Sequence, residues 1–232
     1  MNGFKKENCV CKNHCSNWNT SQCSSLCQSY WYSSYVMSRS NIPPKLQSPK
    51  IMEPQRRDIV PYQTLTAIQN DIYRFVYEGQ NLFIHSLKRC NGKTTWATNL
   101  MLQYFFEVSS WCGKTIRGVF VSVPMFLIQL KNSMNTPDPN FEQFKESLRI
   151  ADLVIWDDIG SNKLSAYDVG VLYAYIQERL LGGKSNIYTG TFDKAHLTHL
   201  LTANLENTIC NNVLFVTFNS EAYKANDFFT NN

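Results

Sequence analysis

Residues 85–97 read HSLKRCNGKTTWA, and this stretch decides which fold the chain is expected to adopt. The segment that leads into it, NLFIHS (81–86), is a short apolar run, and KTTWATNLMLQYFFEV (93–108) is expected to be a helix. A loop that ends in G-K-T between a buried strand and a helix is typical of phosphate binding. The N–H groups and the dipole at the helix start attract an anion.

Each residue at the end of this loop has a predicted role in holding a nucleotide. Gly92 lets the backbone approach the phosphates, Lys93 reaches the β- and γ-phosphates, and the Thr94 hydroxyl ligates Mg²⁺. Asn91 and Thr95 flank these residues and complete the predicted binding set. A G-K-[ST] tripeptide also arises by chance in about one protein in ten of this size. The interpretation therefore rests on the position of this tripeptide between a strand and a helix.

A second candidate element is LVIWDDI (153–159), in which apolar residues run directly into two carboxylates. One carboxylate at a strand end can hold Mg²⁺ while its neighbour polarises the attacking water. We assign the metal role to Asp157 and the role of base to Asp158. The alternative is a strand that ends in two solvated acids.

Strands and helices alternate after residue 81, which predicts an α/β fold with a parallel sheet flanked by helices. Within the strand 185–191, Thr191 or Thr189 would place a hydroxyl between the acidic pair and the γ-phosphate, although both are also ordinary strand-end residues. The expected strands are 81–86, 117–124, one within 151–160, 185–191 and 213–218. The expected helices are 62–78, 93–108, 125–134, 141–149, 165–181 and 193–201.

Length, composition and charge set broad limits on the class of protein. The 232 residues, 44% of them hydrophobic, are enough for one α/β domain and a small appendage. No run of eighteen apolar residues and no signal peptide are present, so we expect a cytoplasmic protein without a membrane partner. Residues 1–57 carry eight Lys or Arg against two Glu, which makes them basic. They would face nucleic acid or an acidic partner, or they are simply solvated.

The N-terminal segment holds most of the cysteines and suggests a zinc site. Its C-x3-C-x7-C-x3-C spacing suits tetrahedral Zn²⁺, and clustered cysteines in a cytosolic protein favour metal over disulfides. The alternative is a set of free thiols in a disordered tail. The predicted ligands are Cys11, Cys15, Cys23 and Cys27, with Cys9 and His14 as spare candidates.

Proline divides this segment from the rest of the chain. Five of the eight prolines fall within residues 41–61, and proline favours extended backbone in itself and in the residue before it. We therefore predict a Cys-rich zinc-binding domain over residues 1–40, a Pro-rich linker over 41–61 and the α/β domain over 62–232.

The order of these segments resembles that of the DnaC/DnaI-type helicase loaders of Gram-positive bacteria and their phages, from about residue 9 to 220. The resemblance implies a P-loop AAA+ ATPase domain with a parallel five-stranded sheet of order 5-1-4-3-2. It also implies a small N-terminal zinc-binding domain that contacts the replicative helicase, and single-stranded DNA binding by the ATPase domain. ATP, Mg²⁺ and Zn²⁺ are the implied cofactors. After the Cys-rich N-terminus, the segments that carry the resemblance are SNIPPKLQ, VYEGQNLFIHS, NGKTTWATNLML, VFVSVPMFLIQLK, NTPDPNFEQFK, ADLVIWDDIG and SNIYTGT.

Individual residues can be carried over from this resemblance. Lys93 and Thr94 match the Walker A motif, and Asp157 and Asp158 match Walker B. Arg179 occupies a position after Walker B where this group often has Arg, which implies a catalytic role. The four cysteines match the zinc cluster.

The chain also departs from the family pattern. Relatives typically carry Gly where Cys90 stands, and Asn near Thr191 as sensor 1. Residues 202–218 have Asn204 and Thr208 where the family has arginines, and no Arg follows Arg179. Because an Arg in trans often supplies much of the rate in such ATPases, we expect weak ATP hydrolysis or dependence on a partner's Arg.

Three functions remain open from the sequence. The first is an ATP-binding helicase loader for DNA replication initiation, which delivers a hexameric replicative helicase to single-stranded DNA and self-assembles on the helicase or DNA. The second is a catalytically degenerate helicase- or DNA-binding adaptor that binds nucleotide without efficient hydrolysis. The third, a small-molecule kinase, is disfavoured because its lid usually needs arginines that the C-terminal region lacks.

Overall fold

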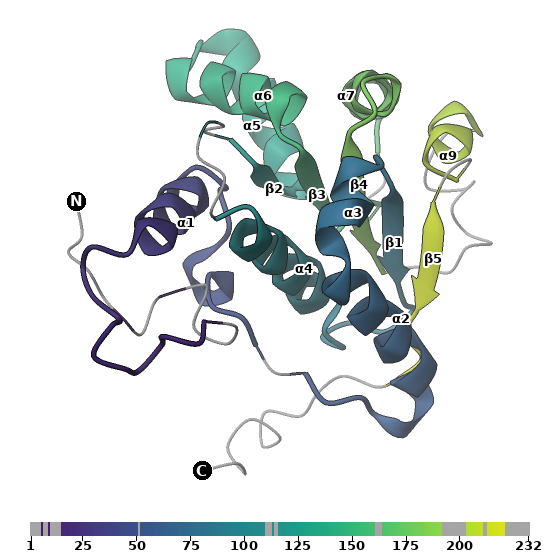
Figure 1. Ribbon diagram of the computed structural model, residues 1–232. Coiled ribbons are helices and arrows are strands. Elements are labelled where there is room, and N and C mark those ends of the chain that lie inside the picture. Colours follow the sequence, from purple (N-terminus) through teal and green to yellow (C-terminus); the bar gives the residue numbers. More distant parts are fainter. Residues whose placement is uncertain are drawn as a thin grey trace.

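The elements of the chain form a parallel sheet with helices on both faces, as a computed structural model shows (Figure 1). The structure describes residues 6, 9, 15–50, 52–109, 113, 116–160, 164–191, 203–210 and 213–220. The strands are β1 (Asn81–His85), β2 (Gly118–Ser122), β3 (Leu153–Asp157), β4 (Ser185–Gly190) and β5 (Leu214–Thr217). The α-helices are α1 (Gln28–Ser38), α2 (Ile59–Asn70), α3 (Ile72–Tyr77), α4 (Lys93–Glu107), α5 (Val123–Asn135), α6 (Pro139–Ile150), α7 (Ala166–Leu181) and α9 (Ala203–Cys210). Two short 3₁₀ helices are η2 (Pro44–Leu46) and η3 (Arg56–Asp58).

The strands follow one another across the sheet in the order β2-β3-β4-β1-β5, and all pairs are parallel. Read from the β5 edge, this is the order 5-1-4-3-2. Because the strands are parallel, the loops after β1, β3 and β4 all leave from the same edge. We call this side, where the strands end, the carboxyl edge, and we call the opposite side, where the strands begin, the amino edge. The predicted phosphate loop and acidic pair therefore meet at the carboxyl edge.

The side chains on the two faces of the sheet pack into two separate hydrophobic cores. Leu82 and Ile84 of β1 point into the core shared with α1, α2, α3 and α4. Phe83, between them, points into the core shared with α5, α6, α7 and α9. Every residue of β1 is buried, which is why this strand reads as a continuous apolar run.

Most of the expected helices lie where the sequence places them, with two differences. The predicted helix 62–78 is two helices, because Asp71 leaves the helical conformation with φ −128° and ψ 35°. Helix α9 was not predicted, and the expected helix 193–201 lies outside the described residues. Within the described ranges, no helix is both long and apolar enough to cross a lipid bilayer.

The N-terminal segment packs on the α/β domain. Val36 and Met37 of α1 belong to the same core as Leu100 of α4. The same core includes Ile42, so it holds residues on both sides of the predicted boundary between residues 40 and 41, and the division into domains stays a prediction.

The segment around this boundary and the following linker are also held by hydrogen bonds. Ser40 O accepts from Phe120 N at 2.7 Å, and Asn41 Nδ2 donates to Phe120 O at 3.0 Å. Further along, the Asn99 side chain of α4 bonds both backbone groups of Lys50, at 3.1 and 2.8 Å. Both segments are thus anchored to the domain.

Candidate functional site

The loop between β1 and α4 contains two residues with left-handed backbone. Gly92 precedes the helix with φ 93°, and its carbonyl accepts from Trp96 N at 2.8 Å. Cys90 has φ 56°, a region that glycine enters freely and other residues enter at a cost. The position where relatives of the resembled family carry Gly is therefore one whose conformation favours Gly.

Lys93, the first residue of α4, is almost fully buried in this loop, with 8% of its surface exposed. Its ammonium donates to Lys88 O at 2.7 Å and to Asn91 Oδ1 at 3.0 Å. Burial lowers the pKa of Lys93, while the nearby Asp158 and Asp157 act in the opposite direction. The ammonium is thus held by neutral acceptors of its own loop, which an incoming anion can replace.

Asn91, the other predicted binding residue of the loop, is buried beneath it. Its Nδ2 donates to Ser86 Oγ at 2.7 Å, and its Oδ1 accepts from Lys93. Thr95 is half-buried in the first turn of α4. Asn91 therefore orients Lys93 in this structure and presents no free donor to solvent.

The end of β3 meets the start of α4 through one carboxylate oxygen. Asp157 Oδ1 accepts from Thr94 Oγ1 at 2.8 Å and from Thr189 Oγ1 at 2.7 Å. The Thr189 hydroxyl in turn accepts from Asp158 N at 2.9 Å. The structure thus brings Lys93, Thr94, Asp157 and Asp158 to one place.

The two acidic residues differ in backbone and environment. Burial raises the pKa of the half-buried Asp157, and the hydrogen bonds from Thr189 and Thr94 oppose that shift. Asp158 has φ 61°, so the chain turns sharply directly after the strand. Left-handed backbone at a non-glycine residue is frequent at functional sites, where the surroundings hold it in place.

Of the two candidate threonines on the fourth strand, Thr189 is the one that contacts the acidic pair. Thr191 follows the end of β4 and, within the part of the chain that the structure describes, makes no hydrogen bond to Asp157 or Asp158. The register between β3 and β4 explains this contact, because Trp156 pairs with Tyr188. The next residues along, Asp157 and Thr189, are therefore neighbours.

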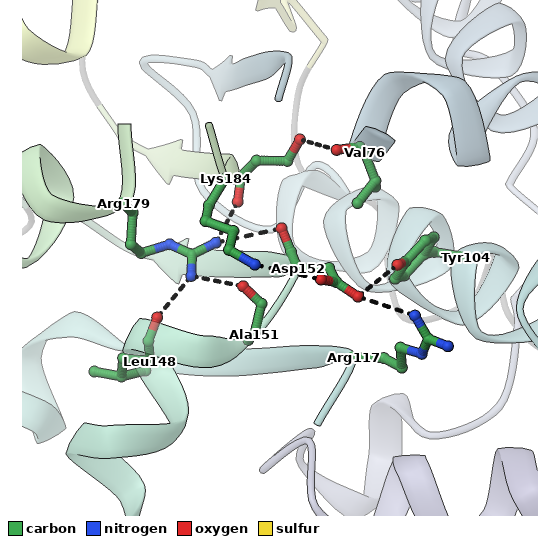
Figure 2. A network of polar contacts seen from close by, with 9 residues as sticks. Val76, Tyr104, Arg117, Leu148, Ala151, Asp152, Arg179 and Lys184 are labelled. Carbon is green, nitrogen blue, oxygen red and sulfur yellow. Dashed lines mark hydrogen bonds and ion pairs between the residues drawn. The ribbon is translucent and has the colours of Figure 1, made fainter. Parts of the chain in front are cut away.

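Arg179 lies at the amino edge of the sheet, remote from the acidic pair at the carboxyl edge. It is 1% exposed and donates to Asn186 Oδ1 at 2.8 Å. Figure 2 shows its guanidinium directed at backbone carbonyls, which include Leu148 O at 2.6 Å and Ala151 O at 2.9 Å. Ser185 O accepts from it at 2.6 Å. In this structure these bonds hold together segments that enter β3 and β4, and the catalytic role of Arg179 stays a prediction.

A second group of polar side chains accompanies Arg179 at this edge (Figure 2). The Asp152 carboxylate accepts from Tyr104 at 2.9 Å and from Arg117 at 3.2 Å, and Lys184 lies 3.5 Å away. Burial and the neighbouring Asp152 raise the pKa of Tyr104, so its hydroxyl stays a donor. We call these residues, together with Arg179, the amino-edge network.

The structure gives the predicted zinc site no support. No three His, Cys, Asp or Glu side chains form a group suited to a metal ion among the described residues. Cys15, Cys23 and Cys27 are half-buried free thiols, and Cys15 and Cys27 pack against the hydrophobic core. Cys11 and His14 lie outside the described residues.

Comparison with known proteins identifies the fold. No family model matches the sequence, and no curated protein does. The structure is similar to that of the DnaC helicase loader, with a TM-score of 0.61 and 19% identity over 73% of this chain and 94% of that one. It is similar to DnaI, with a TM-score of 0.58 and 19% identity over 78% and 96% of the two chains.

A third similar structure is the replication initiator DnaA bound to AMPPCP and single-stranded DNA. Its TM-score is 0.60 and its identity 12%, over 78% of this chain and 52% of that one. The chain therefore shares an α/β fold, with five parallel strands, with these three structures.

Proposed function

We propose that this protein is an ATP-binding helicase loader that acts in the initiation of DNA replication. The observation that carries the proposal is the contact between Thr94 and Asp157, 2.8 Å apart, beside the buried ammonium of Lys93. This is the arrangement that a magnesium–nucleotide site requires at the start of a helix. The likeness of fold to DnaC, DnaI and DnaA supports a role for this nucleotide site in DNA replication.

The side chains present fit ATP and Mg²⁺. The Thr94 hydroxyl and the Asp157 carboxylate supply the oxygen ligands that Mg²⁺ prefers, and they already lie together. Lys93 would exchange the Lys88 carbonyl for phosphate oxygens and keep its bond to Asn91. When bound, Mg²⁺ would neutralise charge on the β- and γ-phosphates. Asp158 would orient the attacking water, and Thr189 would hold both acids in place.

Turnover is proposed to be slow in the isolated protein. Cys90 keeps a side chain where the loop wraps the phosphates and adopts φ 56°. No Arg follows Arg179 in the sequence, and Arg179 itself is buried at the opposite edge. These features favour either an Arg supplied by a partner or the alternative function, an adaptor that binds nucleotide without efficient hydrolysis.

The proposed partners are a replicative helicase hexamer and single-stranded DNA, in the cytoplasm, with self-assembly on either of them. The N-terminal segment offers apolar side chains for the helicase, since Leu26 is 88% exposed and Trp31 and Tyr35 of α1 are about two-fifths exposed. The excess of Lys and Arg in residues 1–57 suits an acidic surface. Zn²⁺ on the N-terminal cysteines stays a prediction, which metal analysis of the purified protein can test.

A loading assay with one Lys93 variant tests the proposal. Cognate helicase is placed on single-stranded DNA by the wild type, by Lys93→Ala and by Lys131→Ala, which removes the same charge from an exposed site outside residues 1–57. Loss of loading in Lys93→Ala alone supports the nucleotide-dependent loader. Unchanged loading in both variants supports the adaptor. No loading by the wild type would overturn both.

A further inference from the structure

Asp58 is a buried acid that ties two distant segments together. It is 2% exposed and lies at the end of η3, directly before α2. Its Oδ1 accepts from Asn219 N at 2.7 Å, and its Oδ2 accepts from Ser220 N at 3.3 Å. Among the described residues no Lys or Arg forms an ion pair with it. A buried carboxylate needs hydrogen-bond donors, and here they are the two backbone N–H groups. Asp58 therefore fixes the chain just after β5.

The segment that Asp58 fixes reaches the phosphate loop. Asn91 Nδ2, which donates to Ser86 Oγ at 2.7 Å, also lies 3.5 Å from Ser220 O. The other end of the same amide accepts from Lys93 Nζ at 3.0 Å. A path of hydrogen bonds therefore runs from Asp58 through Ser220 and Asn91 to the ammonium that is proposed to bind phosphate.

The surroundings of this path show that it is enclosed in the domain. Asn91 is 1% exposed and Ser220 is 3% exposed. The Ser220 hydroxyl has no hydrogen-bond partner within the described ranges, so Ser220 is held there through its backbone alone. Figure 1 shows α2, which Asp58 precedes, beside the carboxyl end of β5. The position of Ser220 thus depends on where the chain enters α2.

We propose that Asp58 is a positioning residue for nucleotide binding, which acts through Ser220 and Asn91 on Lys93. This inference rests on the proposed function, because it assigns Lys93 to the phosphates. It adds a route by which the linker before α2 controls the nucleotide site. A partner that pulls on the N-terminal segment would displace Asp58, release Asn91 and weaken nucleotide binding.

A purely structural role for Asp58 makes a different prediction. In that case Asp58→Asn lowers the stability of the fold but leaves nucleotide affinity unchanged, or its effect on affinity adds to that of Asn91→Ala. If Asp58 acts through Asn91, the two effects on affinity do not add, because removing either residue breaks the same path.

The experiment is a double-mutant cycle on the affinity for a non-hydrolysable ATP analogue with Mg²⁺, measured by calorimetry. We expect Asp58→Asn to weaken binding about tenfold, the worth of one charge-assisted hydrogen bond, and Asn91→Ala to do the same. The double variant should bind the analogue with the same affinity as whichever single variant binds it less tightly. Asp71→Asn, the same change at an exposed acid, is the control and should bind like the wild type. Unchanged affinity in Asp58→Asn, or additive losses, overturns the proposal.

Hydrogen exchange of residues 86–93 without nucleotide separates this proposal from the proposed function. If the wild type binds no nucleotide, the proposed function fails, yet exchange still reports on the path. Faster exchange of this loop in Asp58→Asn, with wild-type exchange in Asp71→Asn, supports positioning. Equal exchange in all three proteins overturns it. Asn91→Ala tests the path from its other end if Asp58→Asn folds poorly.

Discussion

The two edges of the sheet each bury a cation, and they hold it in opposite ways. At the amino edge, the Arg179 guanidinium bonds the Asn186 side chain, a carbonyl just before β3 and the carbonyl of the first residue of β4. At the carboxyl edge, the Lys93 ammonium bonds Lys88 O and Asn91 Oδ1 of its own loop. Arg179 joins segments far apart in the sequence, whereas Lys93 joins none.

If Lys93 binds phosphate as proposed, this difference separates structural from functional use of buried charge. A buried cation whose donors are taken by distant backbone groups cannot leave without breaking the packing around it. A buried cation that bonds a local carbonyl can exchange this acceptor for a ligand at little cost. Left-handed backbone at Cys90 and Asp158 falls only on the second side of this comparison.

The largest expected effect on stability comes from removing the Arg179 side chain at the amino edge. Arg179→Ala should lower the free energy of unfolding by about 3–5 kcal/mol, because it leaves several buried carbonyls without a donor. Urea unfolding measures this, with Arg149→Ala as the control, since that side chain is 44% exposed and should cost less than about 1 kcal/mol. If Arg179→Ala weakened nucleotide binding and spared stability, the comparison would be wrong.

A pair of threonine variants tests the contacts of the acidic residues at the carboxyl edge. Thr189→Val removes the acceptor of Asp158 N and a donor to Asp157, so we expect a loss of about 1–3 kcal/mol in stability and slower ATP turnover. Thr191→Val is the matched control and should change neither quantity. Unfolding and phosphate-release assays measure them. Equal effects of the two substitutions would contradict the placement of Thr189.

The raised pKa of Asp157 predicts a pH dependence of stability. The folded protein holds the Asp157 proton at a pH where the unfolded chain has lost it, so it binds more protons across that window. The free energy of unfolding therefore falls as pH rises from the ordinary pKa of an aspartate to the raised one. Asp157→Asn should lack this fall. Parallel pH profiles of the two proteins, from urea unfolding at each pH, would refute the assignment.

The smallest expected effect concerns the backbone of the phosphate loop. Cys90→Gly removes the cost of left-handed backbone but frees the unfolded chain, so stability should change by less than about 1 kcal/mol. Nucleotide affinity should rise a few-fold, because the loop can wrap the phosphates more closely. Cys90→Ala removes the thiol and keeps the Cβ, so it should bind like the wild type. Calorimetry distinguishes the two variants.

The sequence predicts the parts of the site that depend on local pattern. The strand–loop–helix unit gives Lys93 and Thr94, and the apolar run into two acids gives Asp157 and Asp158. The choice of Thr189 over Thr191 depends on the register between β3 and β4, which no local pattern contains.

Other features escape the sequence because they depend on tertiary contacts. Arg179 reads as a family catalytic position, but its side chain turns to the amino edge and is buried there. Asp71 breaks a helix that the apolar spacing predicts as continuous. Asp58 has no motif of its own, since its partners lie 161 and 162 residues away.

The hydrogen bonds between Ser40, Asn41 and Phe120 have a consequence for solubility. Strand β2 ends the sheet on one side, and an uncovered edge strand is a template for pairing with another chain. Ser40 and Asn41 occupy the N–H and C=O of Phe120 at that edge. Removal of residues 1–41 would expose this N–H and C=O, so we expect the shortened protein to aggregate more readily than the full chain.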